Sequence, residues 1–350
     1  MAFSPDTGRR TRVTIREVAL HADVSQMTVS RVLNKRDSVR PDTRDRVEAA
    51  IQELGYRPNL AARSLAGGAS CSIGVIYHNA SDSYLGEVLR GALTGSHAQG
   101  HQLFVESLPD ADKDHSLHEL SERLTRIGFD GVILVPPLSE SEKVLDLLAS
   151  IGVPCVLIAP ASAARPERSV AIDDAAAAQA MTQHIIAQGH TRIAFIRGPA
   201  GQVSADSRWE GFEAAMAEAG LPVRKGWTAE GDYTYRSGML AAEKILTAGK
   251  TRPTVIFASN DDMAAGAITT AYRLGLPVPD NLSVVGYDDT RVATSIWPQL
   301  TTVRQPIADM AARAVAMLAD AVQGTAQESE PPARVVLDFE IIQRESLCRI

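Results

Sequence analysis

The stretch 26–33 carries side chains that could make a defined set of hydrogen bonds. If this stretch is helical, Val29, Val32 and Leu33 form one apolar stripe that must face inward. The residues that then project outward are Gln26, Met27, Ser30 and Arg31. Arg, Gln and Ser side chains hydrogen-bond to base edges in the DNA major groove, so the outward face is a candidate reading face. Short amphipathic helices are common, however, and the pattern also fits a purely structural helix.

The residues before this stretch predict a helix that would position it. The run from Thr14 to Glu17 fits a capping box, in which each residue's side chain accepts a hydrogen bond from the other's backbone amide. This helix should end near residues 22–23, and Ser25 is a second N-cap. Two short helices with a turn of about three residues between them predict a helix-turn-helix.

A third helix and a short fourth one are expected next. Pro41 suits the first position of a helix, and Gly55 follows its apolar pattern. That pattern consists of Val47, Ala50, Ile51 and Leu54. The stretch 60–66 is too short to be stable alone, so we expect it to be helical only against a partner copy or DNA.

Charge is distributed unevenly along the 350 residues, whose formal net charge is −7. Residues 1–70 hold 12 Lys and Arg against 8 Asp and Glu, whereas the remaining residues hold 23 against 34. A basic head on an acidic body approaches DNA with one end only, because phosphates attract the head and repel the body.

Length and composition indicate a folded protein of two or three compact units, with 45% hydrophobic and 22% charged residues. No apolar run approaches the roughly 20 residues of a membrane-spanning helix, and residues 1–12 lack an export signal. We therefore expect a cytoplasmic protein with no membrane partner. Cys71, Cys155 and Cys348 are far apart and form no CxxC pair, which indicates neither a disulfide framework nor a zinc site.

From residue 71 onward, short apolar runs alternate with longer helical patterns. The runs typical of buried parallel strands are 73–76, 103–105, 132–135, 153–158, 193–196, 255–258 and 284–287. Helical patterns such as 209–219 and 261–273 are followed by Gly220 and Gly275. This alternation predicts two doubly wound α/β lobes, with ligands at the carboxyl ends of the strands.

Catalytic patterns are missing from the sequence. It contains no GxSxG, no HExxH, no GxxxxGK and no GxGxxG after a strand. His115 and His118 lie three residues apart, but a solvated helix face explains them better than a metal site. We therefore expect a protein that is not an enzyme and holds neither cofactor nor metal.

Residues 13–70 resemble the DNA-binding head and hinge of the lactose-repressor (LacI/GalR) family. The stretches that carry this resemblance are 24–34, 44–47, 54–59 and 65–67. The body resembles the family's effector domain, which has the periplasmic-binding-protein-like type I fold. The matching stretches there are 189–194, 259–264, 285–289 and 298–303, so the resemblance covers nearly the whole chain.

The resemblance implies an all-α head and hinge followed by an α/β body. The expected segments are a disordered tail at 1–12, a helix-turn-helix domain at 13–57, a hinge helix at 58–70 and an effector-binding and dimerisation domain at 71–350. Within that domain, the expected N-lobe spans about 71–171 and 297–330, and the C-lobe about 172–296 and 331–350. The chain would then cross between the lobes near 171, 296 and 331.

The resemblance also implies the residues that contact DNA. Gln26 and Met27 occupy positions that vary with operator sequence, and Arg31 is the candidate for bidentate contact with a guanine. Met27 would touch a thymine methyl or remain a spectator at the rim. Phosphate contacts are expected from Ser25, Thr28, Ser30 and Asn34. Further DNA contacts are expected from Thr14, Asn59 and Ala62.

Leu65 matches the hinge leucine that this family wedges into the minor groove, although a linker residue packed on its own domain is the alternative reading. Two hinge helices must supply the wedge together, which implies a homodimer on a pseudo-palindromic operator. No leucine heptad follows Arg344, so we expect a dimer and not a tetramer.

Matching positions in the body nominate an effector site at the strand ends. The candidates are Asp82, Tyr84, Ser204, Arg208, Tyr233, Asn260 and Asp288. Their carboxylates, amide, guanidinium and aromatic rings suit a polyol. Trp297 is either a stacking residue or a buried aromatic at the lobe crossover.

Structural roles remain open for three of these candidates. Asp288 and Asn260 could cap helices or turns, and Arg208 could pair with an acid in the cleft. Ile158 is followed by Ala159, whereas many sugar-responsive members carry an aspartate there. The ligand class therefore stays open, since Arg208 suits a sugar acid or a phosphate equally well.

These observations predict a cytoplasmic, nucleoid-associated repressor of carbohydrate-utilisation genes that a small sugar or sugar derivative releases from its operator. A corepressor-type regulator and a regulator that responds to a sugar acid or nucleobase are the alternatives. A free sugar-binding protein would share the body fold, but it would lack residues 13–66 or carry a signal peptide.

Overall fold

A computed structural model describes residues 14–33, 39–54, 70–78, 81–109, 111, 113–160, 168–324 and 334–350. The chain divides into two compact units, Met1–Ser70 and Cys71–Ile350. The expected tail at 1–12 and all but residue 70 of the expected hinge at 58–70 lie outside the described residues. Within the described ranges, no helix combines the length and apolarity needed to cross a membrane.

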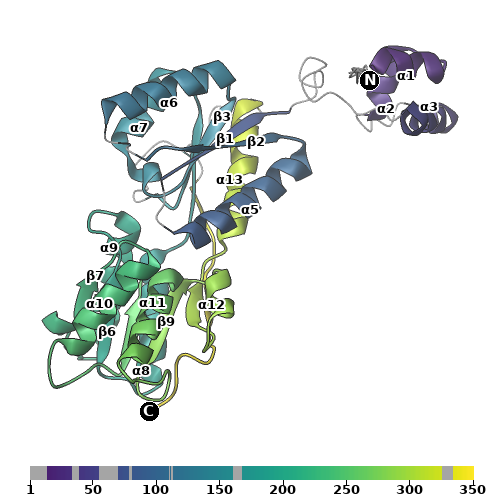
Figure 1. Ribbon diagram of the computed structural model, residues 1–350. Helices are drawn as coiled ribbons and strands as arrows, with labels where there is room; N and C mark the ends of the chain where they lie inside the picture. The colour runs from purple at the N-terminus through teal and green to yellow at the C-terminus, as the bar shows by residue number, and fades with distance from the viewer. Residues whose placement is uncertain are drawn as a thin grey trace, which may run out of the picture. The chain divides into compact units, whose positions relative to one another are not determined.

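The first unit contains three described helices, α1 (Ile15–His21), α2 (Gln26–Leu33) and α3 (Pro41–Leu54) (Figure 1). The predicted capping box at the start of α1 is confirmed: the Thr14 amide donates to Glu17 Oε2 at 2.6 Å and the Glu17 amide to Thr14 Oγ1 at 3.4 Å. The buried core of this unit consists of Val18, Ala19, Ala22, Val29, Val32, Val47 and Ala50. Burial of this shared core, more than the propensity of such short helices, stabilises the three-helix unit.

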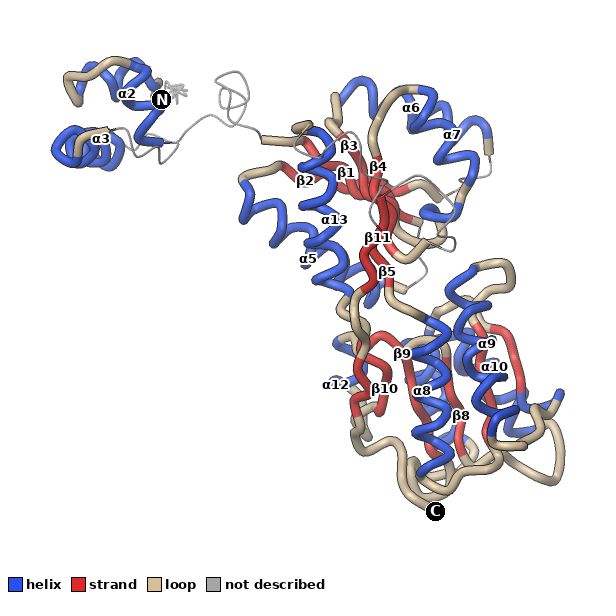
Figure 2. Tube along the Cα trace, turned by 180° about the vertical axis from the view of Figure 1, so that it is seen from behind, coloured by secondary structure: helices blue, strands red, loops and turns tan. Residues whose placement is uncertain are grey.

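The second unit contains two six-stranded sheets, and the first of them is parallel throughout. Its strands run in the order β11 (Arg334–Val336), β5 (Arg168–Ala171), β4 (Cys155–Ile158), β3 (Gly131–Leu134), β1 (Ser72–Tyr77) and β2 (Gln102–Ser107). Helices α5 (Asp82–Gln99) and α13 (Ile307–Val322) lie side by side on one face, and α6 (Asp114–Ile127) and α7 (Glu142–Ser150) cover the other (Figures 1 and 2). The short 3₁₀ helix η1 (Leu138–Glu140) follows β3. We call this half of the unit the first lobe.

The second lobe repeats this plan with one antiparallel edge. Its strands run in the order β12 (Glu340–Ile342), β10 (Thr301–Arg304), β9 (Ser283–Asp288), β8 (Val255–Ala258), β6 (Ile193–Arg197) and β7 (Thr228–Glu230), and only the β10–β12 pair is antiparallel. Its helices are α8 (Asp174–Ala187), α9 (Val203–Glu218), α10 (Tyr235–Thr247), α11 (Asp261–Arg273) and α12 (Arg291–Ser295), with the 3₁₀ turn η2 (Lys225–Trp227). The predicted pair of doubly wound α/β lobes is therefore confirmed.

Strand pairing corrects two of the three expected lobe crossings. The first crossing lies between β5 and α8, close to the expected position near 171. The second was expected near 296, but β10 pairs with β9 of the second lobe, so the chain crosses only after Arg304. The third was expected near 331, but β11 pairs with β5 of the first lobe, which moves the crossing to residues 337–339. A three- or four-residue strand fits either sheet by sequence, and only its pairing partner decides the lobe.

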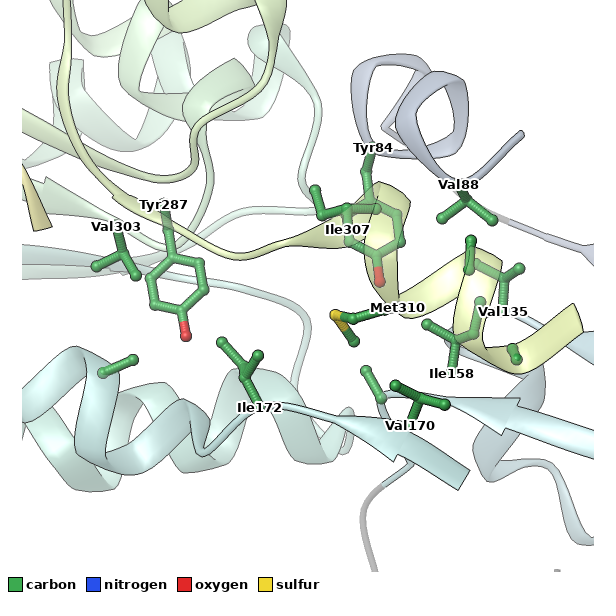
Figure 3. Close-up of a cluster of buried hydrophobic side chains, with 14 of the residues drawn as sticks. Tyr84, Val88, Val135, Ile158, Val170, Ile172, Tyr287, Val303, Ile307 and Met310 are labelled. Carbon is green, nitrogen blue, oxygen red and sulfur yellow. The ribbon is translucent and has the colours of Figure 1, made fainter. Parts of the chain in front are cut away.

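A continuous buried cluster joins the two lobes at these crossings (Figure 3). Val170 and Ile158 belong to its first-lobe part, whereas Tyr287 and Val303 belong to the second-lobe sheet. Because these side chains are fully buried together, the lobes share one core where the chain passes between them.

Candidate functional site

The outward face of α2 is the one that the apolar pattern predicts. Gln26, Met27 and Arg31 are exposed, and Met27 keeps 65% of its surface accessible. Arg31 Nη2 lies 3.6 Å from Met27 Sδ, one helical turn away, so these two side chains form a continuous surface. This surface offers hydrogen-bond donors beside an apolar group, which suits base edges and thymine methyls.

Two of the expected phosphate contacts already have a local role. The Thr28 amide donates to Ser25 Oγ at 3.1 Å, and the hydroxyls of Ser25 and Thr28 lie 2.9 Å apart, so Ser25 caps α2 as predicted. The Thr14 hydroxyl donates to Glu17 Oε2 at 2.9 Å within the capping box. Asn34, Asn59, Ala62, Leu65 and the side chain of Ser30 lie outside the described part of the chain.

A cavity of about 190 Å³ lies between the two lobes at the carboxyl ends of their strands. Its walls are His78, Ser81, Tyr84, Pro136, Pro137, Ala159, Pro199, Gln202, Ser204, Arg208, Asp232, Tyr233, Asn260 and Asp288. The structure thus brings together the expected residues Tyr84, Ser204, Arg208, Tyr233, Asn260 and Asp288.

Two expected effector residues lie outside this wall. Asp82 is exposed in the first turn of α5, because Tyr84, two positions later, turns toward the cavity. Trp297 is 73% exposed in the loop between α12 and β10, so it is neither a cavity residue nor a buried aromatic. Since the lobe crossing follows β10, this loop is not a crossing at all.

Arg208 is buried and already paired. Its Nε donates to Asp174 Oδ1 at 2.8 Å, its Nη1 to the Ser259 carbonyl at 2.6 Å, and its guanidinium lies 3.8 Å from the centre of the Tyr287 ring. Burial by itself lowers the pKa of this guanidinium, but nearby negative charge, above all Asp174, raises it by more, and the net pKa lies well above the ordinary value. The structural alternative for Arg208, pairing with an acid in the cleft, is therefore what the structure contains.

Asp288 is the buried carboxylate of the cavity. Its Oδ1 accepts from Gln305 Nε2 at 2.5 Å and lies 3.9 Å from Arg208 Nη1. Burial raises the pKa of Asp288 to about 7, although Arg208 and the Gln305 hydrogen bond act in the opposite direction. A carboxyl group with this pKa changes its charge near neutral pH, so its protonation state responds to what binds beside it.

Asn260 and Tyr233 differ in whether their polar atoms are free to bind a ligand. Asn260 caps α11, since its Oδ1 accepts from the Met263 amide and its Nδ2 donates to the Tyr233 carbonyl, both at 2.9 Å. The buried hydroxyl of Tyr233 has no hydrogen bond of good geometry with a described residue. Burial raises its pKa, although Arg208 and the nearby Ser204 side chain act in the opposite direction. A Cβ on Gly198 would lie 2.3 Å from that hydroxyl, so only glycine leaves room for it. The Tyr233 hydroxyl is thus a polar group that a ligand can satisfy.

The sequence did not predict some of the residues that line the cavity, nor the buried residues that support them from behind. Pro136 and Pro137 follow β3 after a single residue, Val135, and their position just past a buried strand could have identified them from the sequence. Asp174, Tyr287 and Gln305 support the cavity residues through contacts that only the fold creates.

The lobes contact each other through polar bonds beside the cavity. Ser81 Oγ donates to Asp262 Oδ2 at 2.6 Å and Ser83 Oγ to Asp262 Oδ1 at 3.0 Å. The Val203 amide at the start of α9 donates to Glu140 Oε2 at 3.2 Å. These bonds join α5 and η1 of the first lobe to α11 and α9 of the second, so they hold the cleft in this arrangement.

Among the described residues, no group of three or more His, Cys, Asp or Glu side chains is placed to hold a metal ion.

Two family models match the chain. Residues 14–59 match the bacterial regulatory proteins of the lacI family, and residues 182–347 match a periplasmic binding protein-like domain. Catabolite control protein A of Priestia megaterium is 39% identical over 307 residues, which cover 87% of this chain and 91% of the relative. The HTH-type transcriptional repressor PurR of Yersinia pestis (strain Pestoides F) is 34% identical over 337 residues, which cover 95% and 96%.

Solved structures match over nearly the whole chain. The lac repressor dimer bound to operator and the anti-inducer ONPF superimposes with a TM-score of 0.77 at 28% identity, covering 97% of this chain and 100% of that one. The complex of the transcriptional regulator CelR with cellobiose gives a TM-score of 0.71 at 30% identity, covering 96% and 100%. The chain therefore belongs to the lacI family of bacterial regulatory proteins and is a DNA-binding transcriptional repressor, not an enzyme.

Proposed function

We propose that this repressor binds a small, uncharged carbohydrate between its lobes and releases its operator in response. The observation that carries this proposal is the pairing of Arg208 with Asp174 at 2.8 Å. A guanidinium whose charge is already balanced by a buried carboxylate offers little net attraction to an anionic ligand.

The charge of the cavity wall supports an uncharged ligand. Its ionisable side chains, apart from the tyrosines, are His78, Arg208, Asp232 and Asp288, and Arg208 is the one already neutralised. At neutral pH a sugar acid or a phosphate would meet the Asp232 carboxylate and a partly ionised Asp288, whereas hydroxyl groups can donate to both. The two acidic side chains and the neutralised guanidinium favour a neutral polyol over the sugar acid that the sequence left open.

The apolar part of the wall supports a ring-shaped ligand. Pro136, Pro137, Pro199 and the rings of Tyr84 and Tyr233 alternate with the polar groups. Sugars present apolar C–H faces and polar edges, so a wall of this kind can cover the faces while the polar groups bind the edges. The structural relative CelR was solved with cellobiose, which is consistent with this class of ligand.

The expected DNA mode is a homodimer on a pseudo-palindromic operator, with α2 of each copy in a major groove. Arg31 and Gln26 would contact base edges, while Ser25, Thr28, Ser30 and Asn34 would contact phosphates. Thr14 would make a further DNA contact. Asn59, Ala62 and Leu65 would act from the hinge. Such a protein would work in the cytoplasm on the nucleoid.

Thermal-shift measurements on the purified full chain test the ligand class. The panel contains D-glucose, cellobiose and D-ribose as neutral sugars, D-gluconate as a sugar acid and adenine as a nucleobase. A ligand at 100 times its Kd stabilises the native state by about 2.7 kcal/mol, which is a readily measured rise in melting temperature. We expect a rise with a neutral sugar, and a rise with gluconate or adenine alone would refute the proposed class.

The sign of the response needs a second measurement. Fluorescence anisotropy with an operator selected from random duplex DNA gives the operator Kd with and without the stabilising sugar. We expect the sugar to raise this Kd, because an inducer favours the state with weaker DNA affinity. A lower Kd would identify a corepressor-type regulator instead.

A further inference from the structure

Two consecutive aspartates at the end of β9 have an unusual backbone. Asp288 has a φ of 114° and Asp289 a φ of 56°, values that residues with side chains rarely adopt. Such conformations persist where surrounding contacts hold them, and they cluster at functional sites. The contacts of the two carboxylates are therefore informative.

Asp288 connects the effector cavity to the second lobe crossing. It lines the cavity, and its Oδ1 accepts from Gln305 Nε2 at 2.5 Å. Gln305 directly follows β10, is 3% exposed, and its Oε1 is buried without a hydrogen bond from any described residue. Its amide is thus held mainly through the cavity residue. A ligand group that bonds to Oδ1 of Asp288 competes with Gln305 for that oxygen.

Asp289 holds the neighbouring residue of the same crossing. Its Oδ2 accepts from Arg304 Nε at 2.7 Å, and its Oδ1 lies 2.7 Å from Arg344 Nη2. The Asp289 side chain is only 7% exposed. Arg304 Nη1 also donates to Glu340 Oε2 at 2.9 Å, on the strand after the third crossing. Asp289 and Arg304 therefore join two of the three crossings.

The second crossing leads directly into the first lobe. Gln305 precedes α13, which lies along α5 (Figures 1 and 2). A Cβ on Gly91 of α5 would lie 2.0 Å from the Ala308 carbonyl oxygen of α13, so the two backbones are in close contact. Helices packed this closely move together, because a dense interface deforms little. The first lobe in turn begins with β1, two residues after Ser70 ends the DNA-binding unit.

We propose that Asp288 and Asp289 form a relay in which occupancy of the effector cavity at Asp288 shifts the crossing segment, with the Asp289–Arg304 pair as its positioning contact. This inference rests on the proposed function. A ligand shifts a conformational equilibrium only through contacts that differ between the states, and the Asp288–Gln305 bond is such a contact. The Asp289–Arg304 pair keeps Arg304 and Gln305 in register with β9. A displacement of Gln305 caused by ligand binding at Asp288 therefore moves α13 as well.

A double-mutant cycle on operator affinity tests the relay without requiring a known effector. The variants are Asp288→Asn, Arg304→Gln and their combination. Asparagine tolerates positive φ, and its amide removes the charge and replaces one acceptor oxygen with an NH2 donor. The probe is the operator selected with the parent chain, and its Kd is measured by fluorescence anisotropy. We expect Asp288→Asn to change the operator Kd by about fivefold or more in the parent, and by less than about twofold in the Arg304→Gln background.

Control variants separate the relay from a general loss of stability. Arg224→Gln removes an exposed arginine of the same lobe that stacks 4.6 Å over Trp227, and it should leave the full effect of Asp288→Asn intact. Asp289→Asn should reproduce the effect of Arg304→Gln, which keeps the test decisive if one variant folds poorly. Melting curves establish that each variant is folded.

Equal effects of Asp288→Asn in the parent and Arg304→Gln backgrounds would overturn the relay. An operator Kd that Asp288→Asn leaves unchanged in the parent would also overturn it. If the parent itself selected no duplex, the DNA-binding part of the proposed function would fail first, and the relay with it. That outcome is distinguishable because it appears before any variant is made.

Discussion

Replacing Arg208 with methionine should destabilise the second unit strongly at neutral pH. The side chain is 7% exposed and balances Asp174, whose own side chain is 10% exposed, across 2.8 Å. Removing one partner of such a pair leaves an uncompensated buried charge, which costs about 3–5 kcal/mol. The Tyr287 hydroxyl also donates to Asp174 Oδ1 at 2.8 Å and would remain, so we expect the lower half of this range. Urea denaturation of the full chain, followed by tryptophan fluorescence, measures the loss.

The pH dependence of this loss has a defined sign. Arg208 lowers the pKa of Asp288, so its removal raises that pKa further above about 7, while the unfolded value is about 3.9. A carboxyl group with a raised pKa stabilises the folded state as the pH falls toward its unfolded pKa. At pH 5.5 Asp288 is protonated in both proteins, so its share of the loss disappears, and the loss should be smaller than at pH 8. A loss below about 1 kcal/mol at pH 8, or one that grows on acidification, would refute the reasoning. The double variant with Asp174→Asn should recover part of the stability.

Three further outcomes are expected. Gly91→Ala should lower the urea midpoint, because the new Cβ would lie 2.0 Å from a backbone oxygen and such overpacking costs about 1–3 kcal/mol. Gly86→Ala, where a Cβ would meet nothing within 4 Å, should raise the midpoint through better helix propensity. Equal midpoints for the two variants would contradict the close contact between α5 and α13. Arg31→Ala should weaken operator binding by about 1–3 kcal/mol in anisotropy titrations and relax base preference at one position, and an unchanged Kd would remove Arg31 from the reading face. Asp262→Ala should open the cleft, because it removes the acceptor of two hydrogen bonds between the lobes. The opening would appear as a larger radius of gyration in small-angle X-ray scattering, and an unchanged radius would show that these bonds do not hold the lobes together.

Local signals in the sequence were sufficient for the first unit. The capping box at Thr14, the cap at Ser25 and the start of α3 at Pro41 depend on residues within three positions of one another. The exposed face of α2 follows from helical periodicity alone. Such features need no knowledge of distant parts of the chain, and the structure contains them where they were expected.

The effector cavity was predictable only in part. Asp288 ends a strand, and Tyr84 and Arg208 lie early in the helices α5 and α9 that follow strands; all three lie in the wall because parallel strands bring their carboxyl ends together. Asp82 and Trp297 were expected in the cavity wall, but both are exposed outside it. The direction of the Asp82 side chain depends on the rotation of a helix, and that of Trp297 on the path of a loop. Those quantities are set by packing against the other elements.

The sequence by itself determined the family, the alternation of helices and strands, and the chemical types of residue at the reading face and around the strand ends. Only the tertiary structure decided which sheet β10 and β11 join, that Arg208 is neutralised by Asp174, and that Asp288 and Asp289 bind consecutive residues of one crossing. The reason is that local patterns record periodicity and capping over a few residues. Pairing between strands and the balance of buried charges depend on residues far apart in the sequence, such as Ser169 and Arg334, which meet only after the chain has folded.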